Sequence, residues 1–215
     1  MLVLSKNLLL TIVTLIWLFL ALFAMTRLWK FEGTAGKVGH PPIHWVRSMP
    51  IALDPAKPTL IMLVHPQCPC SRASLTELNH LAALCPNQAA ISVLFLKPAG
   101  YTQAWADTDL WRQAAAILGV TVRVDDNGNM ARRFGAATSG ETVLYAPNGQ
   151  LLYQGGLTGA RGHEGDNAGL SAVAALLLGK PKRAMQEPVY GCPLTADRTG
   201  PNGKTPDVGG LSWLP

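Results

Sequence analysis

Two cysteines separated by a single residue are the strongest chemical feature of this 215-residue sequence. Cys68 and Cys70 flank Pro69, after an apolar run at 59–65 and before an amphipathic run at 71–84. The first run predicts a buried strand, and the 3.6-residue repeat of the second predicts a helix. Backbone N–H groups and the dipole at a helix N-terminus favour a thiolate. A thiolate attacks disulfides and is also a soft metal ligand, so both chemistries are open.

The other two cysteines differ in their ability to pair with this site. Cys85 lies 15 residues after Cys70 in the same predicted helix, which is about 22 Å of helix rise. A disulfide needs Cα atoms within about 7 Å, so we expect Cys85 to be a core residue. Cys192 lies in a C-terminal region rich in Pro and Gly, from which it could reach the site. Cys70 is therefore the first candidate for the thiol that resolves a mixed disulfide on Cys68, and Cys192 is the second.

The remaining pattern predicts one small α/β domain. Strands are expected at 59–65, 91–96 and 120–124, with helices at 71–84, 107–117 and 129–134 between and after them. A hairpin of strands at 142–146 and 151–153, turning at 147–149, precedes a last helix at 166–178. Alternating strands and helices predict parallel strands with right-handed crossovers, and the hairpin makes the sheet mixed. This order resembles the thioredoxin-like plan, a mixed sheet flanked by helices.

The thioredoxin-like plan brings further residues toward Cys68. The first hairpin strand would run antiparallel to 59–65, which places Gly140, Glu141 and Thr142 beside Cys68 as a candidate substrate groove. The loop after the second hairpin strand would reach the same edge and carries His163, either as a ligand or proton-transfer group or as an exposed loop residue. His65, directly before Pro66, is a further candidate neighbour.

An apolar stretch near the N-terminus predicts a membrane anchor. Residues 7–26 carry no charge, and about 20 apolar residues cross a hydrocarbon core of about 30 Å. A cleaved signal peptide fits less well, because no small-x-small site follows the stretch. We therefore expect an anchor at 1–30 with membrane contact through 8–25, a tether at 31–57, a thioredoxin-like domain at 58–179 and an irregular tail at 180–215.

Charge excludes one class of partner and leaves orientation open. The formal net charge is +5, of which Lys6, Arg27 and Lys30 supply three beside the apolar stretch, leaving 5 − 3 = +2 for the rest. So small an excess of positive charge does not indicate a nucleic-acid-binding protein. Basic residues flank both ends of the stretch, so the positive-inside rule does not place the domain. The thiol chemistry is the reason to expect a single-pass membrane protein whose domain lies outside the cytoplasm.

Several separate motifs resemble the RedB-like proteins, bacterial membrane-anchored proteins with a thioredoxin-like domain. The motifs lie at 65–75, 107–111, 134–140, 161–167 and 191–194. The resemblance implies a redox role and a place in the bacterial cytoplasmic membrane, with the domain on the periplasmic side. Two features depart from the wider thioredoxin pattern: Cys-Pro-Cys-Ser replaces Cys-x-x-Cys, and Glu141 stands before Thr142, where the superfamily usually has a cis-proline that shapes the groove and keeps metals off the thiols.

Two functions follow as hypotheses. The first is a membrane-tethered thiol-disulfide oxidoreductase without a cofactor, in which Cys68 attacks a cysteine-containing protein outside the cytoplasm and Cys70 or Cys192 resolves the mixed disulfide. The alternative resembles Sco-type copper chaperones, with Cys68, Cys70 and His163 as Cu(I) ligands. Sco-type proteins have a wider cysteine spacing, so the match is partial.

Overall fold

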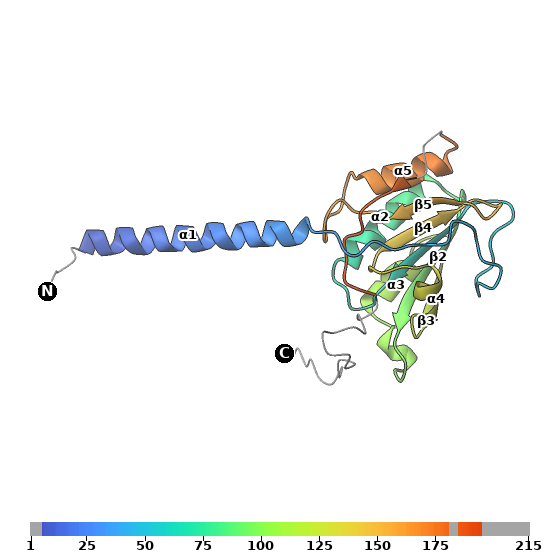
Figure 1. Cartoon of the computed structure of the whole chain (residues 1–215), viewed down its shortest axis with the longest axis horizontal. Coiled ribbons are helices and arrows are strands. Elements are labelled where there is room, and N and C mark those ends of the chain that lie inside the picture. The colour runs from blue at the N-terminus through green and yellow to red at the C-terminus, as the bar shows by residue number, and fades with distance from the viewer. Residues whose placement is uncertain (1–5, 181–184, 195–215) are drawn as a thin grey trace.

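A long apolar helix, α1 (Lys6–Glu32), projects from the rest of the chain (Figure 1). The structure, a computed structural model, describes residues 6–180 and 185–194. None of the residues of α1 is buried, and the helix is long and apolar enough to cross a membrane. An N-terminal helix of this kind can serve as a membrane anchor or as a signal sequence.

The domain is built on one mixed sheet of strand order β3-β2-β1-β4-β5-β6. Its strands are β1 (Thr59–Val64), β2 (Ala90–Lys97), β3 (Val120–Asp126), β4 (Glu141–Tyr145), β5 (Leu151–Gly155) and β6 (Met185–Gln186). Strands β1, β2 and β3 are parallel, β4 is antiparallel to both β1 and β5, and β6 is parallel to β5. This strand order and these strand directions are those of the thioredoxin-like plan expected from the sequence. The predicted mixed sheet flanked by helices is confirmed.

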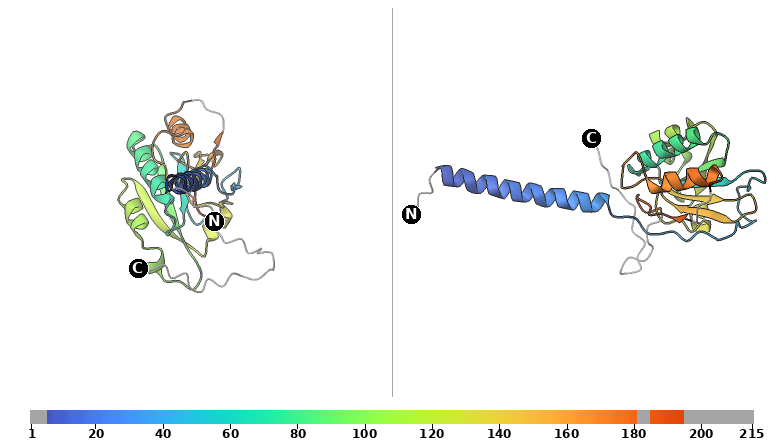
Figure 2. Two further views of the ribbon diagram at one scale, coloured as in Figure 1. Left: turned by 90° about the vertical axis from the view of Figure 1, so that its left-hand side faces the viewer. Right: turned by 90° about the horizontal axis from the view of Figure 1, so that it is seen from above.

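Three helices cover one face of the sheet: α2 (Ser71–Leu84), α3 (Asp109–Ala115) and α5 (Ala168–Leu177). Figure 2 shows α2 and α5 on the same side of the sheet. Leu75, Leu78 and Leu81 recur at helical spacing along α2 and are fully buried against alternate residues of β1. The helix expected at 107–117 is shorter and follows a 3-10 turn at Gln103–Trp105.

The other face is covered by α4 (Asn129–Arg133) and by the segment between α1 and β1. Met49 and Ile51 are buried in its core, and the ring of Trp45 lies 5.5 Å from that of Phe134 and 5.1 Å from that of Tyr145, centroid to centroid. The segment expected as a tether at 31–57 is therefore in part a layer of the domain. The segment is rich in proline and has no hydrophobic periodicity, so its packing on the sheet was not predictable from the sequence.

Within the region expected to be an irregular tail at 180–215, residues 185–194 also join the domain, whereas 181–184 and 195–215 lie outside the described residues. Its residues 185–186 form β6 at the edge of the sheet, and residues 187–194 continue across the ends of the strands. A two-residue strand between prolines carries no alternating pattern, so β6 was not predictable from the sequence.

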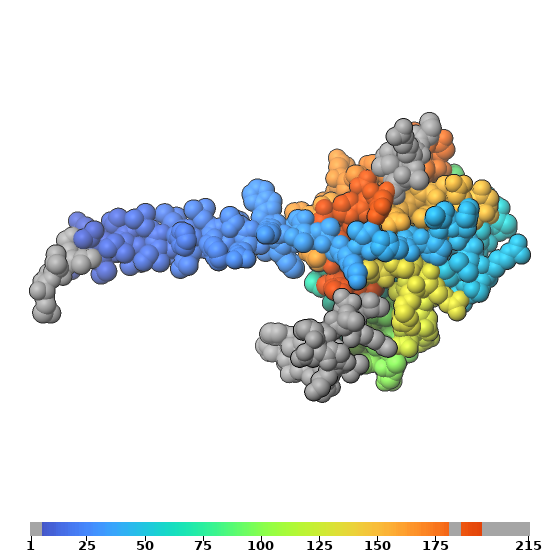
Figure 3. Space-filling model, in the orientation of Figure 1, coloured from blue at the N-terminus to red at the C-terminus, as the bar shows by residue number. Residues whose placement is uncertain are grey.

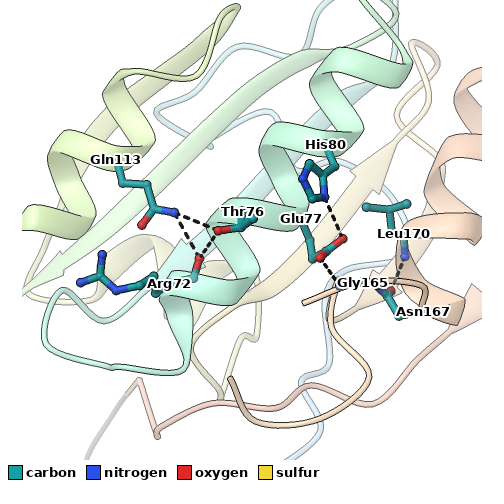
Figure 4. A network of polar contacts seen from close by, with 8 residues as sticks. All are labelled: Arg72, Thr76, Glu77, His80, Gln113, Gly165, Asn167 and Leu170. Atoms are coloured by element: carbon teal, nitrogen blue, oxygen red, sulfur yellow. Dashed lines mark hydrogen bonds and ion pairs between the residues drawn. The ribbon is translucent and has the colours of Figure 1, made fainter. Parts of the chain in front are cut away.

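Polar contacts fix α2 between its neighbours (Figure 4). The carboxylate of Glu77, which is 1% exposed, accepts a hydrogen bond of 2.6 Å from the backbone N–H of Gly165. On the other side, Gln113 of α3 donates to the backbone carbonyl of Arg72 and to the hydroxyl of Thr76. These contacts hold α2 against α3 and against the loop before α5.

Candidate functional site

Cys68 and Cys70 lie in the turn between the end of β1 and the start of α2. The backbone N–H of Cys68 donates to the carbonyl of His65, and the N–H of Ser71 donates to the carbonyl of Cys68, both at 3.0 Å. Cys68 is only 1% exposed, whereas Cys70, the residue before the first turn of α2, is half-buried. The turn thus puts one sulfur inside the domain and the other nearer its surface.

Hydrogen-bond donors surround the Cys68 sulfur. The thiol of Cys192 donates to it, as do the Ser71 hydroxyl and backbone N–H. The backbone N–H of Cys192 also donates to it, at 3.3 Å. These donors, the Cys192 thiol above all, lower the pKa of Cys68 from 9.0 to about 4 although burial acts in the opposite direction. Cys68 is therefore a thiolate at neutral pH.

Two serines orient one of these donors. The hydroxyl of Ser139 accepts a hydrogen bond of 2.7 Å from the backbone N–H of His65 and lies 2.7 Å from the hydroxyl of Ser71. If Ser139 donates its own hydrogen to Ser71, the hydrogen of Ser71 is free to point at the Cys68 sulfur. Ser71 stands where a Cys-x-x-Cys motif has its second cysteine, and here a hydroxyl stabilises the thiolate at that position.

The other two sulfurs of the site stay protonated. Burial and the negative charge of Cys68 raise the pKa of Cys70, against the opposing effect of the nearby Arg161 guanidinium. The hydrogen bond to Cys68 and burial raise the pKa of Cys192 well above its ordinary value. The site therefore holds one thiolate and two thiols, which is the protonation pattern that thiol-disulfide exchange requires.

Residues 187–194, here called the C-terminal segment, bring Cys192 to the site. The N–H of Ser139 donates to the carbonyl of Cys192 at 2.8 Å, and the N–H of Leu194 donates to the carbonyl of Ala137 at 2.9 Å. The linker after α1 runs across this segment, blue over orange-red in Figure 3, and the N–H of Gly36 donates to the carbonyl of Val189.

The candidate groove at 140–142 is buried beneath these contacts. Gly140 has a φ of +89°, a conformation that favours glycine, and its N–H donates to the carbonyl of Leu63. Thr142 is fully buried and its hydroxyl donates to the carbonyl of Gly140. The backbone directly before them, at 137–139, is paired with the C-terminal segment. The place predicted for a substrate is thus occupied by the chain itself.

Glu141 is a buried carboxyl group that joins two backbone segments. Its side chain is 1% exposed and accepts hydrogen bonds from the N–H groups of Ala137, Thr138 and Gly39. Burial raises the pKa of Glu141 from 4.5 to about 7, against the effect of these donors. This residue connects the loop before β4 with the linker after α1.

The predicted histidines lie apart from the cysteines to different degrees. The His163 ring is exposed, with Nε2 3.6 Å from a carboxylate oxygen of Glu32 at the end of α1. The His65 ring packs edge-on against Trp105, and burial lowers its pKa although the nearby Cys68 acts in the opposite direction. Within residues 6–180 and 185–194, no group of three or more His, Cys, Asp or Glu residues is placed to hold a metal ion.

Cys85 lies at the C-terminal end of α2 and is buried in the core between the sheet and helices α2, α3 and α5, as expected. Two contributors to the site had no individual signal in the sequence, Ser139 and Arg161. Each contacts residues more than 25 positions away, and spacing along a chain carries no information on such contacts.

No family model and no curated relative matches the chain. Among solved structures, it is similar to an uncharacterized conserved protein from Geobacillus kaustophilus, with 21% identity and a TM-score of 0.54 over 78% of this chain and 95% of that one. It is also similar to a hypothetical protein from Sinorhizobium meliloti, with 21% identity and a TM-score of 0.52 over 76% and 96%.

A weaker likeness is to a secreted disulfide oxidoreductase from Mycobacterium tuberculosis that is homologous to E. coli DsbE. It has 15% identity and a TM-score of 0.41 over 57% of this chain and 81% of that one. At 21% identity the two likenesses with TM-scores above 0.5 show a common fold, and the function has to be argued from the site.

Proposed function

We propose that this protein is a thiol-disulfide oxidoreductase and that Cys68 is its nucleophile. The observation that carries the proposal is the set of donors around the Cys68 sulfur, which holds its pKa at about 4 inside the domain. A thiolate is the attacking species in disulfide exchange. Two thiols, Cys70 and Cys192, lie close enough to Cys68 to exchange hydrogen bonds with it.

The first step is attack of the Cys68 thiolate on a partner disulfide. A bond forms between the Cys68 sulfur and one partner sulfur, the partner disulfide breaks, and its second sulfur leaves as a thiolate that takes a proton from solvent. A second thiol of this chain then attacks the Cys68 sulfur and releases the partner in its reduced form. Because Cys68 is 1% exposed, the C-terminal segment has to move aside before a partner can reach it.

We further propose that the partner is a cysteine-containing protein and that α1 holds the domain at the bacterial cytoplasmic membrane, on its periplasmic side. The length and apolar composition of α1 support the anchor. The thiol chemistry supports an oxidising compartment, and the RedB-like resemblance agrees with both. A fusion of alkaline phosphatase to the C-terminus tests the side: an active fusion supports it, and an inactive one contradicts it.

A disulfide-reduction assay tests the activity. The full chain, reduced and kept in detergent, is mixed with a disulfide-containing protein, and new partner thiols are counted with a mass-tag reagent. The Cys68→Ser variant should lose the exchange entirely, because its hydroxyl is not ionised at neutral pH. Cys85→Ser, which alters a cysteine remote from the site, is the matched control and should retain it. Equal exchange by the wild type and Cys68→Ser would refute the proposal.

The copper hypothesis makes a different prediction for the same protein. It requires tight Cu(I) binding that weakens in the His163→Ala variant, because two thiols and an imidazole would share the metal. The exposed position of His163 beside Glu32 gives this hypothesis no support. Titration of the reduced chain with Cu(I) against a competing chelator separates the two functions.

A further inference from the structure

We propose that Cys192 is the thiol that closes an internal disulfide with Cys68, so that the C-terminal segment is a moving part of the reaction. This inference rests on the proposed oxidoreductase function and assigns the second step of that reaction to one residue. Three observations carry it: the way the C-terminal segment is bound, the place of the Cys192 sulfur, and the restraint on Cys70.

The C-terminal segment is bound along its whole described length. Buried side chains flank the cysteine on both sides, Val189 before it and Leu194 after it. Between them, the guanidinium of Arg161 donates to the carbonyl of Gly191 at 2.6 Å. Backbone hydrogen bonds join the segment to β5, to the linker after α1 and to the loop before β4, at Glu187, Pro188, Val189, Cys192 and Leu194. The place of Cys192 is therefore set by contacts on either side of it.

A close backbone approach brings Cys192 onto Cys68. A Cβ atom at Gly191 would lie 2.0 Å from the carbonyl oxygen of Ser139, so only glycine fits there. This approach puts the backbone N–H of Cys192 3.3 Å from the Cys68 sulfur, and the Cys192 thiol also donates to that sulfur. Both the backbone N–H and the thiol of Cys192 thus contact the Cys68 sulfur. A residue that only covered the site would not need to make these two contacts.

Cys70 is less able to close the bond. It is two residues from Cys68, and the turn between them is fixed by hydrogen bonds from Ser71 to Cys68 and from Arg72 to Pro69. A disulfide has narrow limits on its dihedral angle and Cβ separation, and a ring across one proline can meet them only by distorting this turn. Cys192 comes from a separate segment, so a bond from it to Cys68 closes no such short ring. The Cys70 sulfur accepts from the Arg161 guanidinium, and the Cys70 thiol also lies within hydrogen-bond reach of Cys68.

The step balances with the partner disulfide as the oxidant. After the partner has formed a mixed disulfide with Cys68, the Cys192 thiol gives its proton to solvent and its sulfur attacks the Cys68 sulfur. The Cys68–Cys192 bond forms, the bond to the partner breaks, and the partner sulfur leaves and is protonated. Two electrons pass from the two cysteines to the partner, which ends as a dithiol. The reverse sequence oxidises a partner dithiol.

Disulfide mapping on the full chain in detergent tests the assignment, with glutathione as the probe. The reduced protein is equilibrated with graded ratios of oxidised to reduced glutathione, quenched by acid and mapped by peptide mass spectrometry. We expect a Cys68–Cys192 link in the wild type and in Cys70→Ser. In Cys192→Ser we expect Cys68 to accumulate as a mixed disulfide with glutathione. Cys85→Ser is the matched control and should behave as the wild type does.

The outcomes that overturn the inference differ from those that overturn the proposed function. A Cys68–Cys70 link in the wild type, with Cys192→Ser resolving glutathione as fast as the wild type, would refute the role of Cys192 and leave the oxidoreductase function intact. Failure of Cys68 to exchange with glutathione in every variant would refute both. Circular dichroism of each variant verifies that it is folded before its result is counted.

Discussion

Replacement of Cys192 by alanine should raise the pKa of Cys68 by a measurable amount. The change removes the thiol that donates to the Cys68 sulfur and leaves the backbone N–H of residue 192 in place. A hydrogen bond to a charged group contributes about 1.5–3 kcal/mol. Since one pH unit corresponds to about 1.4 kcal/mol, the pKa of Cys68 should rise by about 1–2 pH units from its value of about 4.

The ultraviolet absorbance of the thiolate measures this shift. The reduced protein is titrated with acid, and the titration of the Cys68→Ser variant is subtracted so that only the Cys68 signal remains. Cys192→Ser is the matched variant: its hydroxyl can still donate, so the pKa of Cys68 should rise less than in Cys192→Ala. Cys85→Ala should leave it unchanged, because Cys85 is buried at the far end of α2.

Two results would refute the reasoning. If Cys68 titrates in the ordinary range of a thiol in the wild type, the donors around it do not stabilise the thiolate. If it titrates at a low pH equally in the wild type and in Cys192→Ala, the stabilisation comes from Ser71, the start of α2 and the backbone N–H of residue 192, and the Cys192 thiol has no part in it.

Three further predictions concern the surroundings of the site. The Glu141 carboxyl has a pKa of about 7 in the folded protein, against 4.5 for an unperturbed glutamate. As the pH rises from 4.5 to 7, the unfolding free energy of the wild type should therefore fall by about 3 kcal/mol relative to that of Glu141→Gln. Urea unfolding of both proteins across this pH range measures the difference. Trp45→Ala should cost about 2 kcal/mol of unfolding free energy, and an unchanged urea midpoint would mean that the linker does not pack on β4 in solution. Gly191→Ala should displace the C-terminal segment, since its Cβ would lie 2.0 Å from the Ser139 carbonyl oxygen, and the pKa of Cys68 should then rise as in Cys192→Ala.

The turn that carries Cys68 and Cys70 was predictable because its signals are local. Three signals follow one another within about 25 residues: an apolar run, a cysteine pair around a proline, and a helical repeat. The run and the repeat predict the strand and the helix from their own residues alone. The predicted strand β1 and helix α2 agree with the structure to within one residue. The hairpin of β4 and β5 is as local, since Pro147-Asn148-Gly149 marks its turn.

The packing of the linker and of the C-terminal segment was not predictable in the same way. Met49 and Ile51 lie among prolines, where neither a period of 2 nor one of 3.6 can develop. The partner of Cys192 is 124 residues away, and the distance between them depends on contacts made by several other segments. The sequence could therefore offer Cys192 only as an alternative to Cys70.

Arg161 connects the cysteine site with the end of α1. Its backbone N–H donates to the carbonyl of Glu32, its guanidinium lies 5.0 Å from the ring centre of Phe31, and its side chain donates to the carbonyls of Thr34 and Gly191. One residue thus contacts both the last turn of the apolar helix and the segment that carries Cys192. In a membrane-anchored chain, Trp29 and Lys30 would lie at the bilayer surface. Arg161 contacts residues 31, 32 and 34, which directly follow them in the chain, so the site would lie near that surface. A partner that displaces the C-terminal segment would then have to present its disulfide close to the membrane, which favours partners that are themselves held there.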